Sequence, residues 1–443
     1  MRLLLCCESY PPHRGGVQEV MRQIAERMAA RGHDVTVATC HHPQRTGSVV
    51  NGVKIREFRA GGKLAHALNG EIDEYRKFVR ESDADAILIM AAQQWSFDAL
   101  WPVLDQIKSR KVFIPCGFSC LYEPEFSDYF AQMPSIISKL DHLIFNAEKY
   151  RDIDFVRRLG LTDFTVVPNG VDKVEFDQAK DGEFRQRYGI SEDAFVFLTV
   201  GNPVEAKGHR QVIDAFARLD TGGRSATLIS IANWNSHGFF HRALHAVTRL
   251  AEIAQHEGLQ GIGKLVRRQV LRRLVSSKVP TIDSLANKVT SQSRKQVIRT
   301  DLTRSELIQA YMAADLFVFA SKIEYSPLVL FEAAAAGTPF LTVPVGNADE
   351  IVSWTGGGML CPATKDDFGY TTVDPKVLAN EMARGMKDHS LLERLGATAH
   401  ERCRKLFAWD VVIEYYEAIL SGTSPVVQKA DPDAPSLKVS SAQ

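Results

Sequence analysis

Two glutamates with seven residues between them carry the most chemistry in this sequence. Glu324 and Glu332 lie in the stretch Ser-Lys-Ile-Glu-Tyr-Ser-Pro-Leu-Val-Leu-Phe-Glu-Ala-Ala-Ala-Ala-Gly-Thr-Pro. The apolar run Leu316–Ala320 before them fits a short, buried parallel strand. The run Leu328–Ala336 predicts a helix. Glu324 is therefore expected in the loop after a strand, and Glu332 on the next helix, facing back toward that loop.

The start of this helix predicts a binding site for an anion. Ser326 can cap the helix and Pro327 suits its first turn, while Gly337 and Pro339 stop it. Free backbone N–H groups in the segment Tyr325–Leu328 point into the space between the two glutamates. Such a site can bind a diphosphate and hold sugar hydroxyls at both of its ends. The alternative is an amphipathic helix that carries two surface glutamates.

Alternating apolar runs and helical stretches predict the elements that must position these residues. The first series of expected strands is Leu3–Cys7, Val35–Thr39, Ala86–Met90, Val112–Pro115, His142–Asn146 and Thr165–Val167. The second series is Phe195–Val200, Ala226–Ile231, Leu316–Ala320 and Phe340–Val343. Two such βαβ series predict an α/β protein with two Rossmann-like, doubly wound halves. The turn-rich segment Pro168–Asp172 is the expected linker.

Two further loops follow predicted strands and offer groups for a phosphate. Gly15 and Gly16 come after the first strand and open a helix, where glycine permits close backbone approach. Lys207 follows the first strand of the second half, five residues after Asn202. The alternative for Lys207 is a solvated loop lysine.

These motifs together resemble the retaining GT-B glycosyltransferases of family 4, the glycogen-synthase-like class. The resemblance covers nearly the whole chain outside 234–299 and the tail, and its most specific part is the Glu-x7-Glu block with its Ala-Gly-Thr-Pro ending. It implies two Rossmann-like domains that face each other across a cleft. Residues 1–172 would form the acceptor domain, completed by a C-terminal helix at about 407–420, and residues 173–406 the nucleotide-sugar domain. The tail 421–443 is rich in Ser, Pro and Asp and is expected to be disordered.

The resemblance also implies an activity: transfer of a sugar from a nucleotide-diphosphate sugar to an acceptor with retention of configuration. This activity would serve bacterial glycolipid, polysaccharide or glycoconjugate synthesis, and the acceptor would be a sugar or a lipid-linked molecule. Glu324 and Lys207 would be catalytic, with Glu324 on the sugar hydroxyls and Lys207 on the diphosphate, and Glu332 would hold the ribose hydroxyls. The other substrate-binding residues would be Gly15, Gly16, Asn202, Tyr325, Ser326, Pro327 and Leu328. No cofactor and no metal ion is expected.

Two departures from the family pattern favour an alternative function. Asn202 occupies a position where the family has an arginine, so one cation of the diphosphate clamp is missing. The segment Pro115–Cys120 has no histidine, although the family usually has one there, and His13 is the only histidine expected in the cleft. Arg14, Arg210 or an arginine of the expected insertion are candidates to replace the cation. The alternative is a catalytically weak GT-B-like subunit that acts by binding a partner or a membrane.

Composition narrows the classes of partner. The 443-residue chain has a formal net charge of zero, so its overall charge does not favour a polyanionic partner, and no nucleic-acid partner is expected. The apolar run Met1–Cys7 is too short for the h-region of a signal peptide. The seven cysteines are scattered without a C-x-x-C pair, which favours free thiols in a cytoplasmic protein.

The segment from Trp234 to Arg299 does not fit the repeat and is expected to be a basic helical insertion in the C-terminal domain. Its run Lys264–Val275 places basic and apolar residues at helical spacing. One interpretation is a surface that contacts anionic lipid, which would put the protein at the inner face of the membrane. The other is a solvated helical hairpin packed on the domain or on another subunit.

Overall fold

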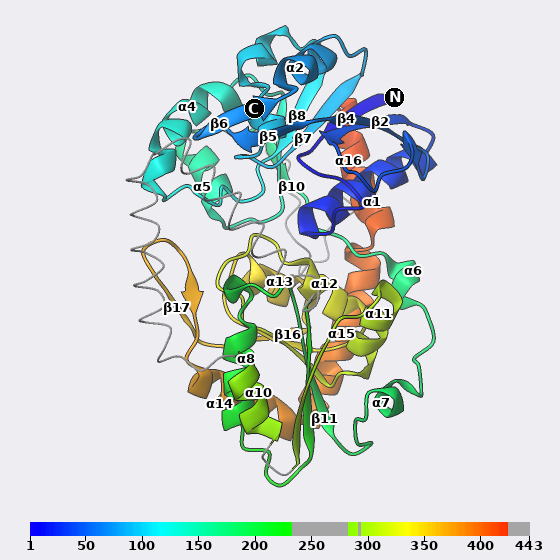
Figure 1. Cartoon of the computed structure of the whole chain (residues 1–443), viewed down its shortest axis with the longest axis vertical. Coiled ribbons are helices and arrows are strands. Elements are labelled where there is room, and N and C mark those ends of the chain that lie inside the picture. Colours follow the sequence, from blue (N-terminus) through cyan, green and yellow to red (C-terminus); the bar gives the residue numbers. More distant parts are fainter. Residues whose placement is uncertain (233–281, 291–293, 424–443) are drawn as a thin grey trace.

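The computed structural model describes residues 1–232, 282–290 and 294–423, and these form two α/β domains (Figure 1). Each domain is built on a mainly parallel sheet flanked by helices. The predicted fold class is therefore confirmed. Within the described residues, no helix combines the length and apolarity needed to cross a bilayer.

The N-terminal sheet has the strand order β10-β9-β8-β7-β1-β2-β4-β3. All neighbours in it are parallel except β3 and β4. Its strands are β1 (Arg2–Cys6), β2 (Asp34–Cys40), β3 (Val49–Val50), β4 (Val53–Phe58), β7 (Ala86–Met90), β8 (Arg110–Ile114), β9 (His142–Phe145) and β10 (Phe164–Val166). A separate antiparallel hairpin consists of β5 (Ala60–Lys63) and β6 (Ala67–Gly70).

Side chains of the central strand β1 alternate between the two faces of this sheet, as the strand period of two requires. Leu3 and Leu5 join one hydrophobic cluster, and Leu4 and Cys6 join the other. The first cluster also receives α1 (Gly16–Ala30) and α16 (Trp409–Ser421). The remaining helices of the domain are α2 (Ile72–Arg80), α3 (Trp95–Asp98), η1 (Trp101–Gln106), η2 (Pro124–Phe126), α4 (Ser127–Ile137) and α5 (Arg151–Arg158).

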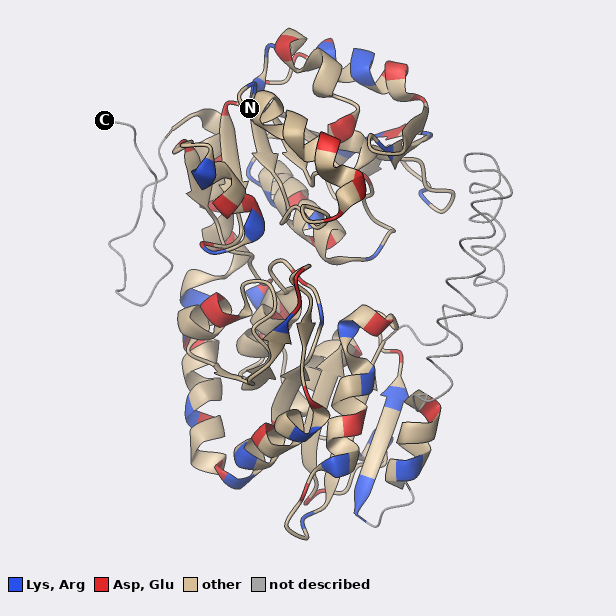
Figure 2. Cartoon of the chain, turned by 90° about the vertical axis from the view of Figure 1, so that its left-hand side faces the viewer, with Lys and Arg blue, Asp and Glu red and all other residues tan. Residues whose placement is uncertain are grey.

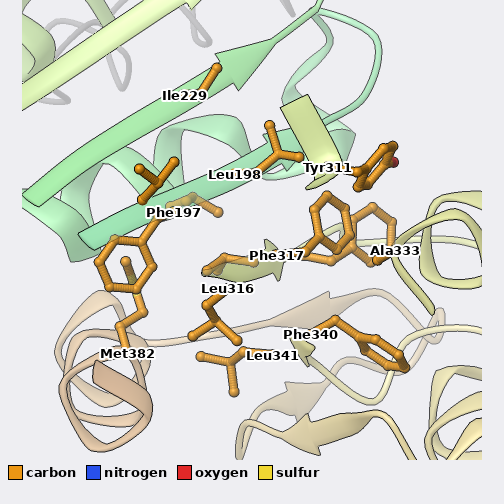
Figure 3. Close-up of a cluster of buried hydrophobic side chains, with 14 of the residues drawn as sticks. Phe197, Leu198, Ile229, Tyr311, Leu316, Phe317, Ala333, Phe340, Leu341 and Met382 are labelled. Atoms are coloured by element: carbon orange, nitrogen blue, oxygen red, sulfur yellow. The ribbon is translucent and has the colours of Figure 1, made fainter. Parts of the chain in front are cut away.

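The C-terminal sheet is parallel throughout, in the order β13-β12-β11-β14-β15-β16. Its strands are β11 (Phe195–Val200), β12 (Ala226–Ile231), β13 (Lys295–Thr300), β14 (Leu316–Phe319), β15 (Phe340–Thr342) and β16 (Gly358–Leu360). Figure 3 shows Phe197, Phe317 and Leu341 from three of these strands in one buried cluster with Met382. The apolar runs that suggested strands are therefore the core of this domain.

Helices flank the C-terminal sheet in two groups (Figure 1). One group contains α8 (His209–Arg218), α10 (Ile282–Thr290) and α14 (Pro375–Lys387), and the other contains α12 (Leu328–Ala335), α13 (Ala348–Thr355) and α15 (His389–Leu406). The remaining elements are α6 (Lys173–Phe176), α7 (Phe184–Arg187), η3 (Glu205–Lys207), α11 (Arg304–Ala313) and the hairpin β17 (Thr364–Lys365) and β18 (Thr371–Thr372).

The chain crosses between the domains twice, and the two crossings are hydrogen-bonded to each other. Val171 N–H donates to Phe407 O at 2.8 Å, and Trp409 N–H donates to Val171 O at 2.9 Å. A Cβ at Gly170 would lie only 2.9 Å from the Trp409 ring, so the close approach needs glycine there. After this contact, α16 packs onto the N-terminal sheet, so the last described helix completes the first domain.

The structure corrects the predicted end of the insertion. The sequence predicts that the insertion extends to Arg299, but residues 295–299 belong to β13, which pairs with β12 in the core sheet. The preceding helix α10 packs on α8. The rest of the expected insertion, including Lys264–Val275, and most of the expected tail lie outside the described residues. In the view of Figure 2, acidic and basic residues are intermixed along the ribbon of both domains.

Candidate active site

Lys207 lies in the loop between β11 and α8, which is held against the loop that follows β14. Gly208 has φ +74°, and a Cβ there would lie 1.9 Å from Ala320 O. Only glycine permits this approach. Lys322 N–H in turn donates to Ala206 O at 2.7 Å. Direct backbone contacts therefore hold the two loops together.

An ion pair joins these two loops. Lys207 Nζ donates to Glu324 Oε1 at 2.5 Å, and Ser321 Oγ donates to the same oxygen at 2.8 Å. The Glu324 side chain is only 13% exposed. Glu324 is thus not a solvated surface residue, and Lys207 is not a free loop lysine.

His209 contacts the backbone of the Lys207 loop, and the sequence does not predict this role. It is buried, with Nδ1 3.1 Å from Ser230 Oγ and Nε2 3.2 Å from Gly201 O. Burial lowers the pKa of His209 to about 4, so the ring is neutral near pH 7. The available signal was a histidine at the first helical position after a Lys-Gly turn.

The helix that carries Glu332 begins differently from the expectation. Pro327, with extended backbone, is the N-cap of α12, and no side chain caps the helix. Ser326 Oγ is buried and has no partner among the described residues, so its predicted capping role is wrong. Pro327 has no N–H, and the N–H groups of Tyr325, Ser326 and Leu328 donate to no group within the described residues. Unused N–H groups at a helix start favour an anion.

Glu332 lies on α12 with both carboxylate oxygens engaged. Arg304 Nη1 donates to Oε1, and Tyr311 Oη donates to Oε2 at 3.1 Å. Arg304 also reaches Glu175 Oε2 through Nε at 3.1 Å and Nη2 at 2.7 Å. The Glu332 side chain is 13% exposed, which excludes the surface-glutamate alternative for it as well. Arg304 and Tyr311 were not anticipated from the sequence.

Tyr325 does not turn toward the α12 start but toward the N-terminal domain. Its hydroxyl accepts a hydrogen bond from Asn146 N–H at 2.8 Å. Its ring packs on Gly117, where a Cβ would lie 2.9 Å from it, and beside the Tyr150 ring at 5.2 Å between centroids. Tyr150 Oη donates to Glu324 O at 2.6 Å. The Tyr325 side chain therefore anchors the Glu324 loop across the domain interface, and only its backbone remains for a ligand.

The segment after β15 adds a second set of contacts between the domains. Gly346 has φ +59°, and a Cβ there would lie 2.3 Å from Tyr325 O. Asn347 Nδ2 donates to Asn146 O at 2.9 Å. Glu350 accepts hydrogen bonds from the N–H groups of residues 148 and 149 at 2.8 and 2.7 Å. Burial raises the pKa of Glu350 to about 7, although the two N–H groups oppose the shift.

The glycine loop of the N-terminal domain meets the start of α12. Gly15 is the N-cap of α1 and Gly16 its first residue. A Cβ at Gly16 would lie 3.8 Å from Leu328 Cδ1, and Leu328 packs on the N-terminal core. Two helix N-termini, from α1 and α12, are thereby brought close together. Leu328 contributes apolar packing through its side chain.

The two positions that depart from the family pattern, Asn202 and the segment Pro115–Cys120, lie in different surroundings. Asn202 is exposed in the Lys207 loop. The segment Pro115–Cys120 has positive φ at Cys116, Gly117 and Phe118, and its Gly117 N–H donates to Asp152 at 2.9 Å. His13 lies 3.8 Å from Cys40 Sγ through Nε2 and packs edge-on against another histidine, and burial lowers its pKa.

Among the candidate cations, Arg210 pairs with Glu205 at 3.3 Å, and Lys322 contacts the same carboxylate. Arg14 is exposed, with no hydrogen bond or ion pair to the described part of the chain.

The arrangement has a clear chemical capacity. Unused backbone N–H groups at a helix start can hold a phosphate group, and a lysine adjoins one side. A carboxylate lies on each side, able to accept hydrogen bonds from hydroxyl groups. The residues come from the ends of β11 and β14 and from α12, which is where ligands bind in open α/β sheets.

Known proteins share both the sequence pattern and the fold. The family profile described as "Glycosyltransferase Family 4" matches residues 14–175, and the profile described as "Glycosyl transferases group 1" matches residues 242–388. A mannosylfructose-phosphate synthase of Agrobacterium fabrum is 24% identical over 272 residues, which is 60% of this chain and 50% of that protein. A D-inositol 3-phosphate glycosyltransferase of Nocardioides sp. is 23% identical over 427 residues, covering 89% of this chain and 82% of that protein.

Solved structures agree on the fold. A sucrose-phosphate synthase from Thermosynechococcus elongatus superimposes with a TM-score of 0.67 at 17% identity, covering 95% of this chain and all of that one. Anabaena Alr3699/HepE in complex with UDP-glucose gives a TM-score of 0.62 at 17% identity, with 95% and 100% coverage. The two family profiles together match most of the chain and show that it belongs to the family 4 glycosyltransferases, and the solved structures show the GT-B fold.

Proposed function

We propose that this protein transfers a sugar from a nucleoside-diphosphate sugar to an acceptor with retention of anomeric configuration. The observation that carries the proposal is the pairing of Lys207 with Glu324 beside the uncapped start of α12, with Glu332 further along the same helix. The HepE structures contain UDP and UDP-glucose, which supports a donor of this class.

The proposed roles follow from the charge that each group offers. The diphosphate lies at the start of α12, where N–H groups and Lys207 stabilise the negative charge that builds up as it leaves. Glu324 accepts hydrogen bonds from the transferred sugar, and Glu332 from the ribose. The expected route is a front-side displacement in which the departing diphosphate helps to deprotonate the acceptor. The protein contributes positioning and charge stabilisation, with no metal ion and no side-chain nucleophile.

The test is a panel of nucleotide sugars in a thermal-shift assay, followed by product analysis. A donor that binds only the folded state stabilises it by mass action and raises the melting temperature. At a donor concentration of 100 times Kd, the free energy of unfolding rises by about 2.7 kcal/mol. The anomeric configuration of the product is then read by NMR. Stabilisation by no nucleotide sugar would contradict donor binding, and an inverted product would contradict retention.

The second candidate is a catalytically weak GT-B-like subunit, favoured by the neutral Asn202 and by the absence of histidine from Pro115–Cys120. Slow hydrolysis of a bound donor without acceptor separates the two functions. An enzyme should release free sugar in proportion to protein concentration, and the Lys207→Ala variant should release much less. Tight binding of a donor with no turnover in either protein would favour the subunit.

A peripheral position at the inner face of the membrane is a further proposal, and it depends on sequence alone. The run Lys264–Val275 contains Arg267, Arg268, Arg272 and Arg273, and each basic residue near an anionic surface adds about 1 kcal/mol of attraction. We expect the protein to bind anionic vesicles less strongly as salt rises, and the four-fold Arg→Gln variant to lose this binding while it keeps donor binding. Indifference to anionic vesicles at low salt would contradict the proposal.

A further inference from the structure

Glu332 is held by two donors from one neighbouring helix. Arg304 occupies the first position of α11 and Tyr311 lies seven residues later, so both side chains reach α12 from the same helix. Arg304 contacts one carboxylate oxygen and Tyr311 the other. A carboxylate held through both oxygens cannot rotate freely about its last bond.

The hydrogen-bond capacity that remains on Glu332 has a specific form. An ionised carboxylate offers about four acceptor positions, two on each oxygen. The donors of α11 occupy one on each oxygen and leave one on each. One remaining acceptor position on each oxygen of a fixed carboxylate can receive two neighbouring hydroxyl groups, as in the 2′- and 3′-hydroxyls of a ribose.

The holding groups are themselves fixed. Arg304 bonds to Glu175 through two nitrogens, which restrains the guanidinium on its far side. Thr303 and Glu306 form a capping box at the start of α11, so the backbone that carries Arg304 is well defined. Burial opposes the charge on Arg304, but Glu332 and Glu175 outweigh it and raise its pKa. Burial and the Glu332 charge raise the pKa of Tyr311, so its hydroxyl keeps the proton that it donates.

We propose that Arg304 and Tyr311 are positioning residues that orient Glu332 for a vicinal diol and so make the site selective for ribonucleotides over 2′-deoxyribonucleotides. This inference rests on the proposed function, because it takes Glu332 to be the ribose-binding group. Neither residue is expected to touch the reacting carbon. Their loss should therefore raise KM for the donor and leave kcat nearly unchanged.

The experiment compares Kd for matched nucleotides by calorimetry. UDP, ADP and GDP are titrated into the full-length protein, and the tightest of them is then compared with its 2′-deoxy form. A hydrogen bond to a charged group contributes about 1.5–3 kcal/mol, so the protein should prefer the ribonucleotide by roughly 10- to 100-fold. In Arg304→Gln the ratio should fall to about 3-fold or less, in Tyr311→Phe it should fall in part, and Arg304→Lys should restore part of the loss.

Arg404→Gln is the matched control. Arg404 pairs with Asp177 in the same domain and is 40% exposed, against 42% for Arg304. Its loss removes a comparable ion pair but no contact to Glu332, so the ratio should not change. Should Arg304→Gln not fold, as judged by its melting curve, Tyr311→Phe carries the same comparison.

The outcomes separate the positioning role of Arg304 and Tyr311 from the proposed function. A protein that binds a ribonucleotide selectively and keeps that selectivity in Arg304→Gln and Tyr311→Phe overturns the positioning role alone. A loss of selectivity in Arg404→Gln of the same size also overturns it, because the effect would then be structural. Failure to bind UDP, ADP or GDP overturns the proposed function and this inference with it.

Discussion

Removal of the Lys207 ammonium group is the sharpest test of the candidate active site. Lys207→Ala takes away the cation that lies 2.5 Å from Glu324, and leaves Ser321 as the remaining donor to that carboxylate. The charge of a leaving diphosphate grows in the transition state. The lost stabilisation should therefore appear in kcat more than in KM for the donor.

The size of the effect follows from the surroundings. Lys207 is 27% exposed and Glu324 13% exposed, so water replaces the lost charge only in part. Loss of one preorganised group facing a developing anion costs about 10²- to 10³-fold in kcat. The cost in folding stability should be much smaller, at about 1 kcal/mol or less, since a partly exposed ion pair contributes little.

The assay measures initial rates of donor hydrolysis, or of transfer once an acceptor is known, together with a melting curve. Lys322→Ala is the matched control, because Lys322 is 25% exposed and pairs with Glu205 at 2.8 Å in the adjacent loop. It should keep nearly full kcat. A near-normal kcat in Lys207→Ala, or an equal loss in both variants, would refute the assignment of Lys207 to the diphosphate.

Three further predictions concern separate parts of the molecule. Glu332→Gln should weaken nucleotide binding by about tenfold in a titration while the melting temperature changes little, and unchanged affinity would refute its role. Because the pKa of Glu350 is raised to about 7, the folded state binds the extra proton, and stability should fall as pH rises from about 4.5 to 7. The slope of melting temperature against pH in that window should be reduced in Glu350→Gln, and an identical slope would exclude Glu350 as a source. Gly208→Ala should destabilise the folded protein by more than the roughly 1–3 kcal/mol of left-handed backbone strain, because the new Cβ would also meet Ala320 O. Gly189→Ala is the control: its φ is +62° and nothing lies within 4 Å of the new Cβ, so backbone strain is its only cost. Equal melting temperatures for the two glycine variants would contradict the proposed contact.

Short-range patterns in the sequence determined the architecture. Buried parallel strands need continuous apolar runs, and helices need apolar residues at their own period, so both can be recognised within about ten residues. The run Leu316–Ala320 matches β14 (Leu316–Phe319), and Leu328–Ala336 matches α12 (Leu328–Ala335). The spacing of Glu324 and Glu332 around a helix start was accessible for the same reason. The N-cap of that helix could not be predicted from the sequence. Ser326 and Pro327 both suit a helix start, and local preference does not separate them.

Only the tertiary structure decided what surrounds those glutamates. Arg304 and Tyr311 lie 28 and 21 residues before Glu332, and no local spacing rule connects residues on different helices. Tyr325 and Asn146 are 179 positions apart and meet because the segments that follow β14 and β9 contact each other across the domain interface. A helix or strand is specified by hydrogen bonds and side-chain contacts between near neighbours in the chain, so its sequence reveals it. A site is specified by which surfaces pack together, and that depends on the whole core at once.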